Sequence, residues 1–391
     1  METPPPSSPG FLPSALLVGA AWLALAAGLA TFAGLLATGH EQRAWSAVLQ
    51  GMLLPLWISV GAVAFLAINH VCGARWIIPL RRVMEGLSRG LWLIPPVIVG
   101  ILTVGGPYLY EWFASDARRA ELFHGSAKAT WMQPTRWAVT ALASVALWLF
   151  LSYRLRKSCE KSDGRIRSAV VLLLVLAPSF TLFVWDLLLS LDARFASTMW
   201  GVYCFTGAIQ TFLAALVLAV LSLRRGPLAL VVREHTLHDL GTWLMAWSAF
   251  CGYIGFAQYL VITYTDLSEE ARWLLPRLQH GYGSAYVAEA LLRVALPFAL
   301  LLSQSLRTRP LALAIAAGAV LLGNVMDWSW MIAPAFSPND YRPFWAMPEI
   351  LVTLGFAGAG LLLALRFWRR HGCVPLGDQQ LAATVAGEHL H

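Results

Sequence analysis

The residues best suited to chemistry include two histidines and an aspartate that precede a long apolar run. His235, His238 and Asp239 stand at positions i, i+3 and i+4, so they share one face of a helix. Such groups can take up and release protons, and a His-x-x-His pair can also bind a metal ion. No further metal ligand accompanies them, and Thr236 with Asp239 also fits a capping box, in which Asp239 would only begin a helix. Proton entry, metal binding and a structural role therefore all stay open for this group.

Acidic residues lie near the ends of the apolar runs that are on the other side of the membrane from these histidines. A charge inside lipid costs at least ~2.5–3.5 kcal/mol, so each of these residues needs a partner or a function. Glu289 and Arg293 stand at i and i+4 and can pair on one helix face, whereas Asn324 and Asp327 can hydrogen-bond a neighbouring helix. Several acids in one third of the membrane favour a hydrated region, which proton relays and quinol oxidation both require. The candidate acids are Glu111, Asp186, Glu289, Asp327 and Glu349.

Between the two sets of titratable groups the apolar runs offer only Gln210, Gln258 and hydroxyl groups. We therefore predict a proton path that leads from the histidines past Gln258 to the acids, with ordered water across its apolar middle. Its candidate residues are His235, His238, Asp239, Gln258, Asp186, Glu289, Asp327 and Glu349.

Cofactors and catalytic machinery are not expected in this chain. Haem b needs two histidines on facing helices, and of nine histidines only His70 comes near the interior of an apolar run. The sequence also contains no phosphate-binding loop, nucleophile elbow or HExxH zinc motif. Its five cysteines form no CxxC pair, so no iron–sulfur site or disulfide framework is indicated. If the chain takes part in redox chemistry, its electrons must travel on partner proteins.

The composition specifies the elements that position these residues. With 58% hydrophobic residues, 13% charged residues and a mean hydropathy of +0.63, the chain is expected to be an all-α polytopic membrane protein. We predict a single membrane domain over residues 11–368, with tails at 1–10 and 369–391. The run 239–264 has titratable groups at both ends, so we expect the other helices to form a scaffold around it. Ten spans are predicted at about 11–38, 48–72, 91–112, 135–153, 168–191, 197–223, 239–264, 284–303, 310–332 and 345–367.

The basic residues predict the orientation of these spans. An even number of spans puts both termini on one side, and the loops of that side hold 18 Lys and Arg against 9 on the other. This bias predicts a multi-pass protein of the bacterial inner membrane with both termini in the cytoplasm. The net charge of +7 follows from the same loops, so membrane lipid is an expected partner and nucleic acid is not.

Two segments resemble the polysulfide-reductase-type (NrfD-like) family of integral membrane subunits. The stretch WDLLLSLDARFASTMWGVYCFTGA at 185–208 is similar to a phrase of that family in which an Asp-Trp/Ser-Leu element precedes a Ser-Thr-x-x-Gly-x-Tyr turn. The stretch HDLG at 238–241, followed by FAQYLVITYTDLSEE at 256–270, resembles HDLGK and FSQYLLIWYANIPEE. Thr242 stands where the family has lysine. The similarity is nearest to the shorter NrfD-like subunit of alternative complex III.

The resemblance implies two four-helix bundles, at about 48–191 and 197–332, flanked by the first and last helices. It also implies a cofactor-free subunit of a quinol:cytochrome c or electron-acceptor oxidoreductase, structural with a possible proton path. The implied partners are an iron–sulfur protein, a multihaem cytochrome c that carries haem c, a second NrfD-like subunit and possibly a terminal oxidase.

Two alternatives remain open from the sequence. In the first, this chain itself binds quinol or menaquinol, and Asp186 or Glu289 accepts the protons. In the second it is an unrelated secondary transporter, which broken spans at corresponding positions of two halves would favour. Pro95, Pro96 and Pro178 interrupt spans but do not correspond well between the halves.

Overall fold

The computed structural model describes residues 13–113, 115–123, 127–161, 164–265, 268–337, 347–376 and 381. Over these residues every regular element is a helix, and ten helices are long and apolar enough to cross a membrane. The chain is therefore an all-α, multi-pass membrane protein, as predicted. The predicted tail at 1–10 and most of the predicted tail at 369–391 lie outside the described residues, although α17 continues to His371.

Each predicted apolar run corresponds to one span. Seven spans contain one long helix: α1 (Ala15–Ala37), α2 (Glu41–Val71), α8 (Pro134–Lys161), α10 (Trp200–Leu223), α11 (Glu234–Thr265), α16 (Pro310–Ile332) and α17 (Met347–His371). In the fifth span the short η5 (Leu189–Leu191) follows α9 (Arg165–Leu187). The third span is divided into η1 (Ile78–Leu80), α3 (Arg81–Leu87), η2 (Ser88–Leu93), α4 (Ile94–Gly100), η3 (Ile101–Gly105) and α5 (Gly106–Leu109). The eighth consists of α13 (Tyr282–Ala290), η6 (Leu291–Ala295) and α14 (Leu296–Leu302).

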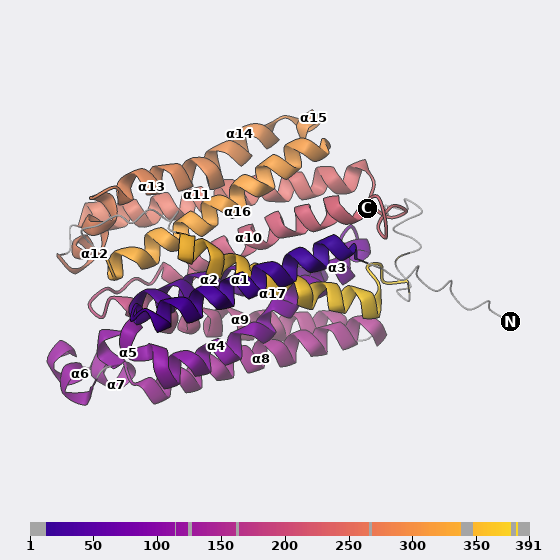
Figure 1. Ribbon diagram of the computed structural model, residues 1–391. Coiled ribbons are helices and arrows are strands. Elements are labelled where there is room, and N and C mark those ends of the chain that lie inside the picture. The colour runs from indigo at the N-terminus through magenta and orange to yellow at the C-terminus, as the bar shows by residue number, and fades with distance from the viewer. Residues whose placement is uncertain are drawn as a thin grey trace.

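Short helices lie between the spans or at their ends, and they distinguish the two ends of the molecule. The helices η4 (Glu111–Phe113), α6 (Asp116–Phe123), α7 (Ala127–Trp131), α12 (Ser268–Leu278) and η7 (Ala333–Ala335) lie at one end, and α15 (Gln304–Arg307) lies at the other. The described chain begins, and α17 ends, at the end that carries α15 (Figure 1). We call this the terminal end and the other the loop end.

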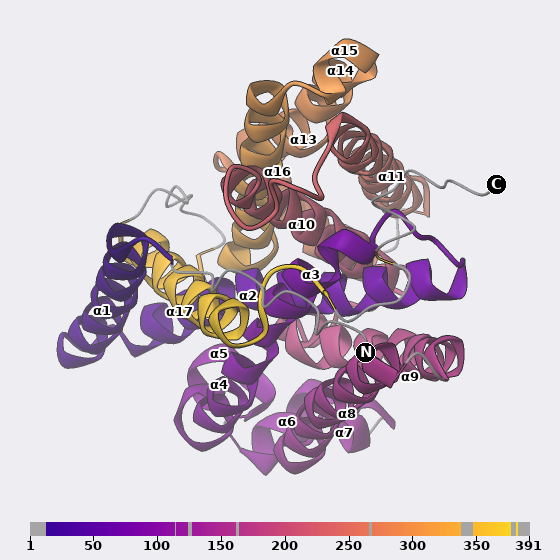
Figure 2. The same ribbon diagram turned by 90° about the vertical axis from the view of Figure 1, so that its right-hand side faces the viewer.

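The spans form two groups of four, with one helix pair beside them. In the first group α2, the third span, α8 and α9 pack on one another, and in the second α10, α11, the eighth span and α16 do so. Helices α1 and α17 pack together at the side, where α17 also contacts α2 (Figure 2). The predicted arrangement of two bundles with two flanking helices is therefore present.

The two bundles meet along α2 and α10, which are the central helices. In α2 83% of the membrane-spanning window is buried and in α10 72%, against 22% in α11. Their backbones approach closely, because a Cβ on Gly61 would lie only 2.6 Å from the Ala208 carbonyl oxygen. The expectation that the run 239–264 is the centre of the fold is wrong: α11 lies at the side of the second bundle. Titratable ends suggested a central role, but burial depends on residues that contact other helices.

A π-helical turn interrupts the eighth span at Arg293. The residue four positions later, Pro297, has no N–H to donate to the Arg293 carbonyl group. The Gln210 side chain from α10 donates to that carbonyl instead, at 2.7 Å. Such turns widen a helix locally and occur often at functional sites. This one turns a charged side chain toward the interior of the second bundle.

Candidate functional site

A buried charged cluster occupies the interior of the second bundle. The Arg293 Nη1 atom lies 2.6 Å from Asp327 Oδ2 on α16 and 3.5 Å from Glu289 Oε2 on α13. The Tyr203 hydroxyl group on α10 donates to the other oxygen of Asp327. The three charged side chains are no more than 5% exposed. The predicted Glu289–Arg293 pair is confirmed, and Asp327 joins it from another helix.

Gln210 connects this cluster to its neighbours. Its amide nitrogen donates to Arg293 O and to Ser248 Oγ on α11, at 2.7 and 3.1 Å. Its amide oxygen accepts from Arg293 Nε at 3.3 Å and from Asn324 Nδ2 at 3.1 Å. All four helical segments of the bundle thus contribute to one polar network, which is the arrangement that buried polar groups require.

The charges in this network are unequal. Two carboxylates, Glu289 and Asp327, share one guanidinium group, that of Arg293. With both acids ionised the network carries one net negative charge, and with one proton bound it is neutral. Since an uncompensated charge is costly away from water, binding of one proton lowers the electrostatic cost of this network. The Tyr203 hydroxyl group donates to Asp327, and it can relay a proton from the protonated acid when it turns to accept that proton and gives up its own.

Two polar atoms in the network have no partner, and both lie near Gly207 of α10. They are Arg293 Nη2 and Asn324 Oδ1. A Cβ on Gly207 would lie 3.5 Å from the first and 3.6 Å from the second, which are ordinary van der Waals distances. The space beside Gly207 therefore lies next to one unused donor and one unused acceptor.

Gly207→Ser is therefore expected to stabilise the protein more than Gly207→Ala does. A serine hydroxyl group can accept from Arg293 and donate to Asn324, and a net hydrogen bond is worth about 0.5–1.5 kcal/mol. The check is the difference in unfolding free energy between the two variants in detergent micelles. Equal stability of the two would contradict the prediction and would mean that a water molecule already satisfies both atoms.

A small aromatic cavity adjoins the cluster on its loop-end side. It is lined by Trp200, Tyr203, Gly255, Gln258, Tyr259, Ile262, Trp273, Leu274, Tyr286 and Trp330. Its volume is about 20 Å³, which accommodates a water molecule but not a quinol ring. Gln258 exchanges hydrogen bonds of 3.1 and 3.2 Å with Ser197, in the connection between α9 and α10. Hydroxyl and amide groups thus extend from Asp327 through Tyr203 toward the loop end.

Arg277, on α12 outside the membrane-spanning segments, contacts a residue that lines this cavity. Its guanidinium group lies 3.9 Å from the centre of the Trp273 ring and donates to the carbonyl groups of Trp273 and Met331, both at 2.7 Å. Burial lowers the pKa of Arg277 to about 9 from its ordinary 12.5. Two carbonyl acceptors and an aromatic face hold this cation beside Trp273, which lines the cavity.

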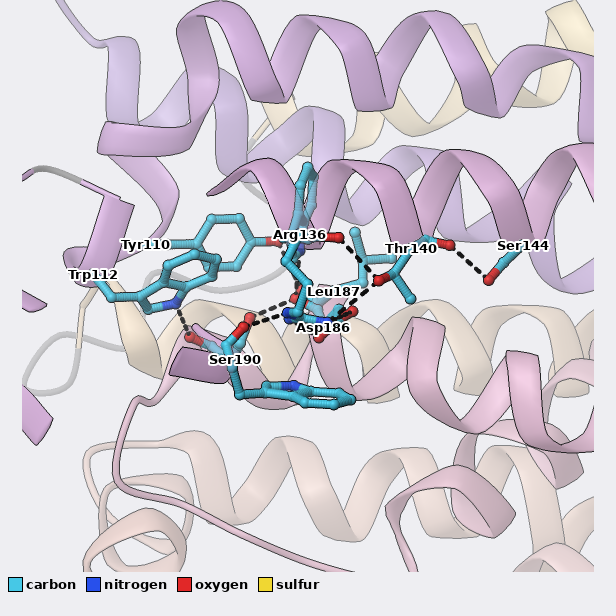
Figure 3. A network of polar contacts seen from close by, with 10 residues as sticks. Tyr110, Trp112, Arg136, Thr140, Ser144, Asp186, Leu187 and Ser190 are labelled. Carbon is cyan, nitrogen blue, oxygen red and sulfur yellow. Dashed lines mark hydrogen bonds and ion pairs between the residues drawn. The ribbon is translucent and has the colours of Figure 1, made fainter. Parts of the chain in front are cut away.

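Asp186 lies in a separate cluster at the loop end of the first bundle. Arg136 on α8 binds both of its oxygens, at 2.9 and 2.6 Å, and the Asp186 side chain is only 1% exposed. Trp137 donates to Asp186 O at 2.7 Å, and Tyr110 donates to the next carbonyl, Leu187 O, at 2.8 Å (Figure 3). This cluster fastens the end of α9 to α8 and to the third span.

Glu349 lies in a third place, at the start of α17. Both its oxygens bind Arg43 of α2, at 2.7 and 3.0 Å. The pair borders a cavity of about 440 Å³ whose other lining residues include His40, Tyr108 and Gln50. Gln50 is 3% exposed, and its Nε2 atom has no partner. Glu111 is the most exposed of the five acids, and it lies 3.4 Å from Arg118.

The terminal end holds His235, His238 and Asp239. His235 is exposed, and the side chains of His238 and Asp239 are 38% and 39% exposed, with 3.6 Å between Nδ1 and Oδ1. Helix α11 begins at Glu234, so Asp239 does not start a helix and the capping-box interpretation is wrong. Within the described ranges no three residues of the His, Cys, Asp and Glu types gather as a metal site would require.

The predicted path residues are thus divided among five places. Glu289 and Asp327 lie together, Gln258 lies beside the adjoining cavity, Asp186 and Glu349 lie in two ion pairs elsewhere, and the histidines lie at the terminal end. The sequence indicated Gln210 only as a mid-membrane amide. It did not identify Tyr203, nor Arg43 and Arg136 as the partners of Glu349 and Asp186. One signal for these ion pairs was present in the sequence. Arg43 and Arg136 are predicted on the same side of the membrane as the acids Glu349 and Asp186, but the two arginines were used only to predict the orientation of the spans.

Comparison with known proteins adds no relative. No protein-family model matches the chain, and no curated protein matches it.

Proposed function

We propose that this chain is a cofactor-free membrane subunit of a quinol-oxidising respiratory complex of the alternative complex III type, and that its second bundle holds and passes protons. Haem c and iron–sulfur clusters then belong to partner subunits, and a second NrfD-like subunit is a further partner. The terminal end faces the cytoplasm, because its loops carry the larger share of Lys and Arg.

The proposal depends most on one observation, which is that the two family-like segments meet at the polar network. Ser197, from the first segment, bonds Gln258 of the second. Trp200 and Tyr203 from the first and Tyr259 from the second line the same small cavity. Segments separated in the sequence thus enclose the approach to Asp327, which supports a shared functional purpose beyond helix packing.

Proton transfer on the loop-end side needs few additional groups. When Asp327 is protonated it donates to the Tyr203 oxygen, and the Tyr203 hydroxyl group passes its own proton to a water molecule in the cavity, toward Gln258 and Ser197. On the terminal side the network ends at Ser248. The next polar group on α11 is Thr242, six residues away, or about 9 Å along the helix. Thr242 bonds the His238 carbonyl group and accepts from Arg307, so ordered water must cross only this interval.

Membership of the complex is tested by affinity purification of the tagged chain from its native membrane. We expect haem c and iron–sulfur spectra from co-purifying subunits, together with quinol oxidation, whereas the separated chain carries neither cofactor. Purification of this chain as a stable lone monomer without redox partners would contradict the proposal. Solute uptake by that monomer in liposomes would favour the transporter alternative.

The proton role is tested in the intact complex with Asp327→Asn and Glu289→Gln. These changes remove the groups that can hold the extra proton. We therefore expect the number of protons moved across the membrane per quinol oxidised, counted beyond the two that quinol oxidation itself releases, to fall at least tenfold in Asp327→Asn in sealed vesicles. Electron transfer in the same sample should continue. The control is Asp186→Asn, because Asp186 lies in another bundle and is not part of the network. Unchanged proton movement across the membrane in both network variants would exclude the proposed role.

Direct quinol binding remains a second candidate because of the cavity beside Glu349. Its volume of about 440 Å³ falls in the usual range of small-molecule sites, and the unpartnered Gln50 amide can donate to a quinone oxygen. Neither Asp186 nor Glu289 lines it. If this cavity binds quinol, Gln50→Leu should raise the KM for quinol while the complex still assembles, and an unchanged KM would exclude this site.

A further inference from the structure

Arginines outnumber acids in a partly buried pocket at the terminal end of the first bundle. The guanidinium groups of Arg81 and Arg82 on α3, Arg89 on η2 and Arg156 on α8 surround Glu85, and Glu160 is the only other acid of the group. We call this the basic pocket. It lies apart from the charged cluster of the second bundle and plays no part in the proposed proton path.

The two acids are already engaged. Glu85 is 5% exposed and lies 3.5 Å from Arg81 Nε and 2.9 Å from Arg82 Nη1. Glu160 lies 3.6 Å from Arg82 and 3.2 Å from Lys157. The pairs formed by these acids therefore involve Arg81, Arg82 and Lys157, and Arg89 and Arg156 are left over.

Arg89 and Arg156 have no carboxylate partner in the described part of the chain. The Nε atom of each is buried and makes no hydrogen bond. Both guanidinium groups contact the same ring, that of Phe367 on α17, with their central carbons 4.5 and 6.0 Å from its centre. An aromatic face stabilises a cation by only about 0.5–2 kcal/mol. Two like charges therefore lie close together, and Glu85, the acid of the same pocket, forms its ion pairs with Arg81 and Arg82 instead.

We propose that the basic pocket binds the phosphate group of an anionic phospholipid. Guanidinium groups bind phosphate oxygens in a two-pronged manner, and basic pockets between membrane helices bind anionic headgroups. The enclosed space, about 20 Å³, admits one phosphate oxygen between Arg89 and Arg156, so the rest of the headgroup lies at its mouth. Apolar lining residues of α2, Val63 and Leu66, provide a surface for the adjoining glycerol and acyl region.

The location fits a lipid better than a dissolved ion. The pocket lies between the ends of spans, where α3 and η2 begin the third span and α8 and α17 end theirs (Figure 1). Phospholipid headgroups occupy this depth in a bilayer. Lys157 and the exposed Arg154 on the same helix can attract anionic lipid to the surface but do not enter the pocket.

The test measures thermal unfolding of the delipidated full-length chain in detergent, with and without added lipid. Phosphatidylglycerol or cardiolipin should raise the unfolding temperature of the wild type, and phosphatidylcholine should not. Arg89→Gln with Arg156→Gln should weaken binding of the anionic lipid at least tenfold, because hydrogen bonds to charged groups are lost. Without lipid the same variant should unfold no earlier than the wild type, because the repulsion between the two cations is removed.

Three controls separate this site from general surface charge. Arg154→Gln removes one exposed cation from the same helix and should leave the lipid effect unchanged. Arg156→Lys keeps the charge and loses the two-pronged geometry, so its lipid binding should fall between wild type and the double variant. Inorganic phosphate alone should give no shift at millimolar concentration, and a shift equal to that of lipid would assign the pocket to a soluble phosphate compound. An equal lipid effect in wild type and double variant would overturn the proposal.

Discussion

Replacing Arg293 by glutamine is expected to lower the unfolding free energy by about 3–5 kcal/mol, because removal of one partner leaves a buried charge uncompensated. Here the loss affects two carboxylates, since Arg293 contacts both Glu289 and Asp327. The Gln210 amide oxygen also loses a donor. The measurement is denaturant-induced unfolding in detergent micelles, followed by helix content.

If uncompensated charge causes this loss of stability, removing the remaining charges of the cluster should restore stability. Adding Glu289→Gln and Asp327→Asn to Arg293→Gln removes every charge and should restore most of the lost stability, since neutral replacements of buried ion pairs are often tolerated. Glu289→Gln alone should be neutral or stabilising, because it removes the excess negative charge. The matched control is Arg272→Gln, an exposed arginine on α12, for which we expect less than about 0.5 kcal/mol. Failure of the triple variant to recover would mean that Arg293 acts through packing instead of charge.

The number and kind of elements could be predicted from the sequence because bilayer thickness imposes one length on every span. Runs of about 20 apolar residues have no other stable conformation in lipid than a helix. Helix ends were less predictable, since α11 begins at Glu234 and α2 at Glu41, within polar segments before the apolar runs. Hydropathy does not predict polar helical turns that extend beyond the bilayer.

Ion pairs between residues close in the sequence could be predicted, and ion pairs between residues far apart in the sequence could not. Glu289 and Arg293 are four residues apart, so helix geometry alone brings them together. Arg43 and Glu349 are separated by 306 positions, and only the packing of α17 against α2 makes them neighbours. The same holds for Arg293 and Asp327, which meet because the eighth span and α16 pack in one bundle. Acids that looked isolated in the sequence are therefore paired in the structure.

The central position of α2 and α10 also depends on contacts that hydropathy does not record. Nearly all membrane helices are apolar on every side, so lipid-facing and protein-facing residues have similar composition. A polar network does start from α10 at Tyr203 and Gln210. The lateral helix α11, however, also carries a glycine at a close approach, Gly252, and an amide, Gln258. Small residues and amides on a run therefore do not separate a central helix from a lateral one.

Replacing Arg136 by glutamine is expected to produce the other large loss, again about 3–5 kcal/mol, because Asp186 then remains buried without its cation. The Arg136 side chain is 22% exposed, so some water reaches the site. We therefore expect a loss in the lower part of that range. Adding Asp186→Asn should recover most of the loss. The measurement is the same unfolding experiment, with trypsin cleavage at Arg194 as a local probe, since Asp186 fastens the end of α9 that precedes this loop.

An exposed ion pair at the same end of the molecule, Arg118 with Glu121, provides a comparison. It indicates that the loss of stability depends on burial of the pair and not on the distance between its atoms. Arg118 lies 2.9 Å from Glu121, as close as Arg136 Nη1 lies to Asp186, but these two side chains are 43% and 68% exposed. Exposed pairs contribute only about 0–1 kcal/mol because water screens them. Arg118→Gln should therefore change the unfolding free energy and the cleavage at Arg194 very little. Equal losses in Arg118→Gln and Arg136→Gln would mean that the buried carboxylate of Asp186 has no special dependence on Arg136.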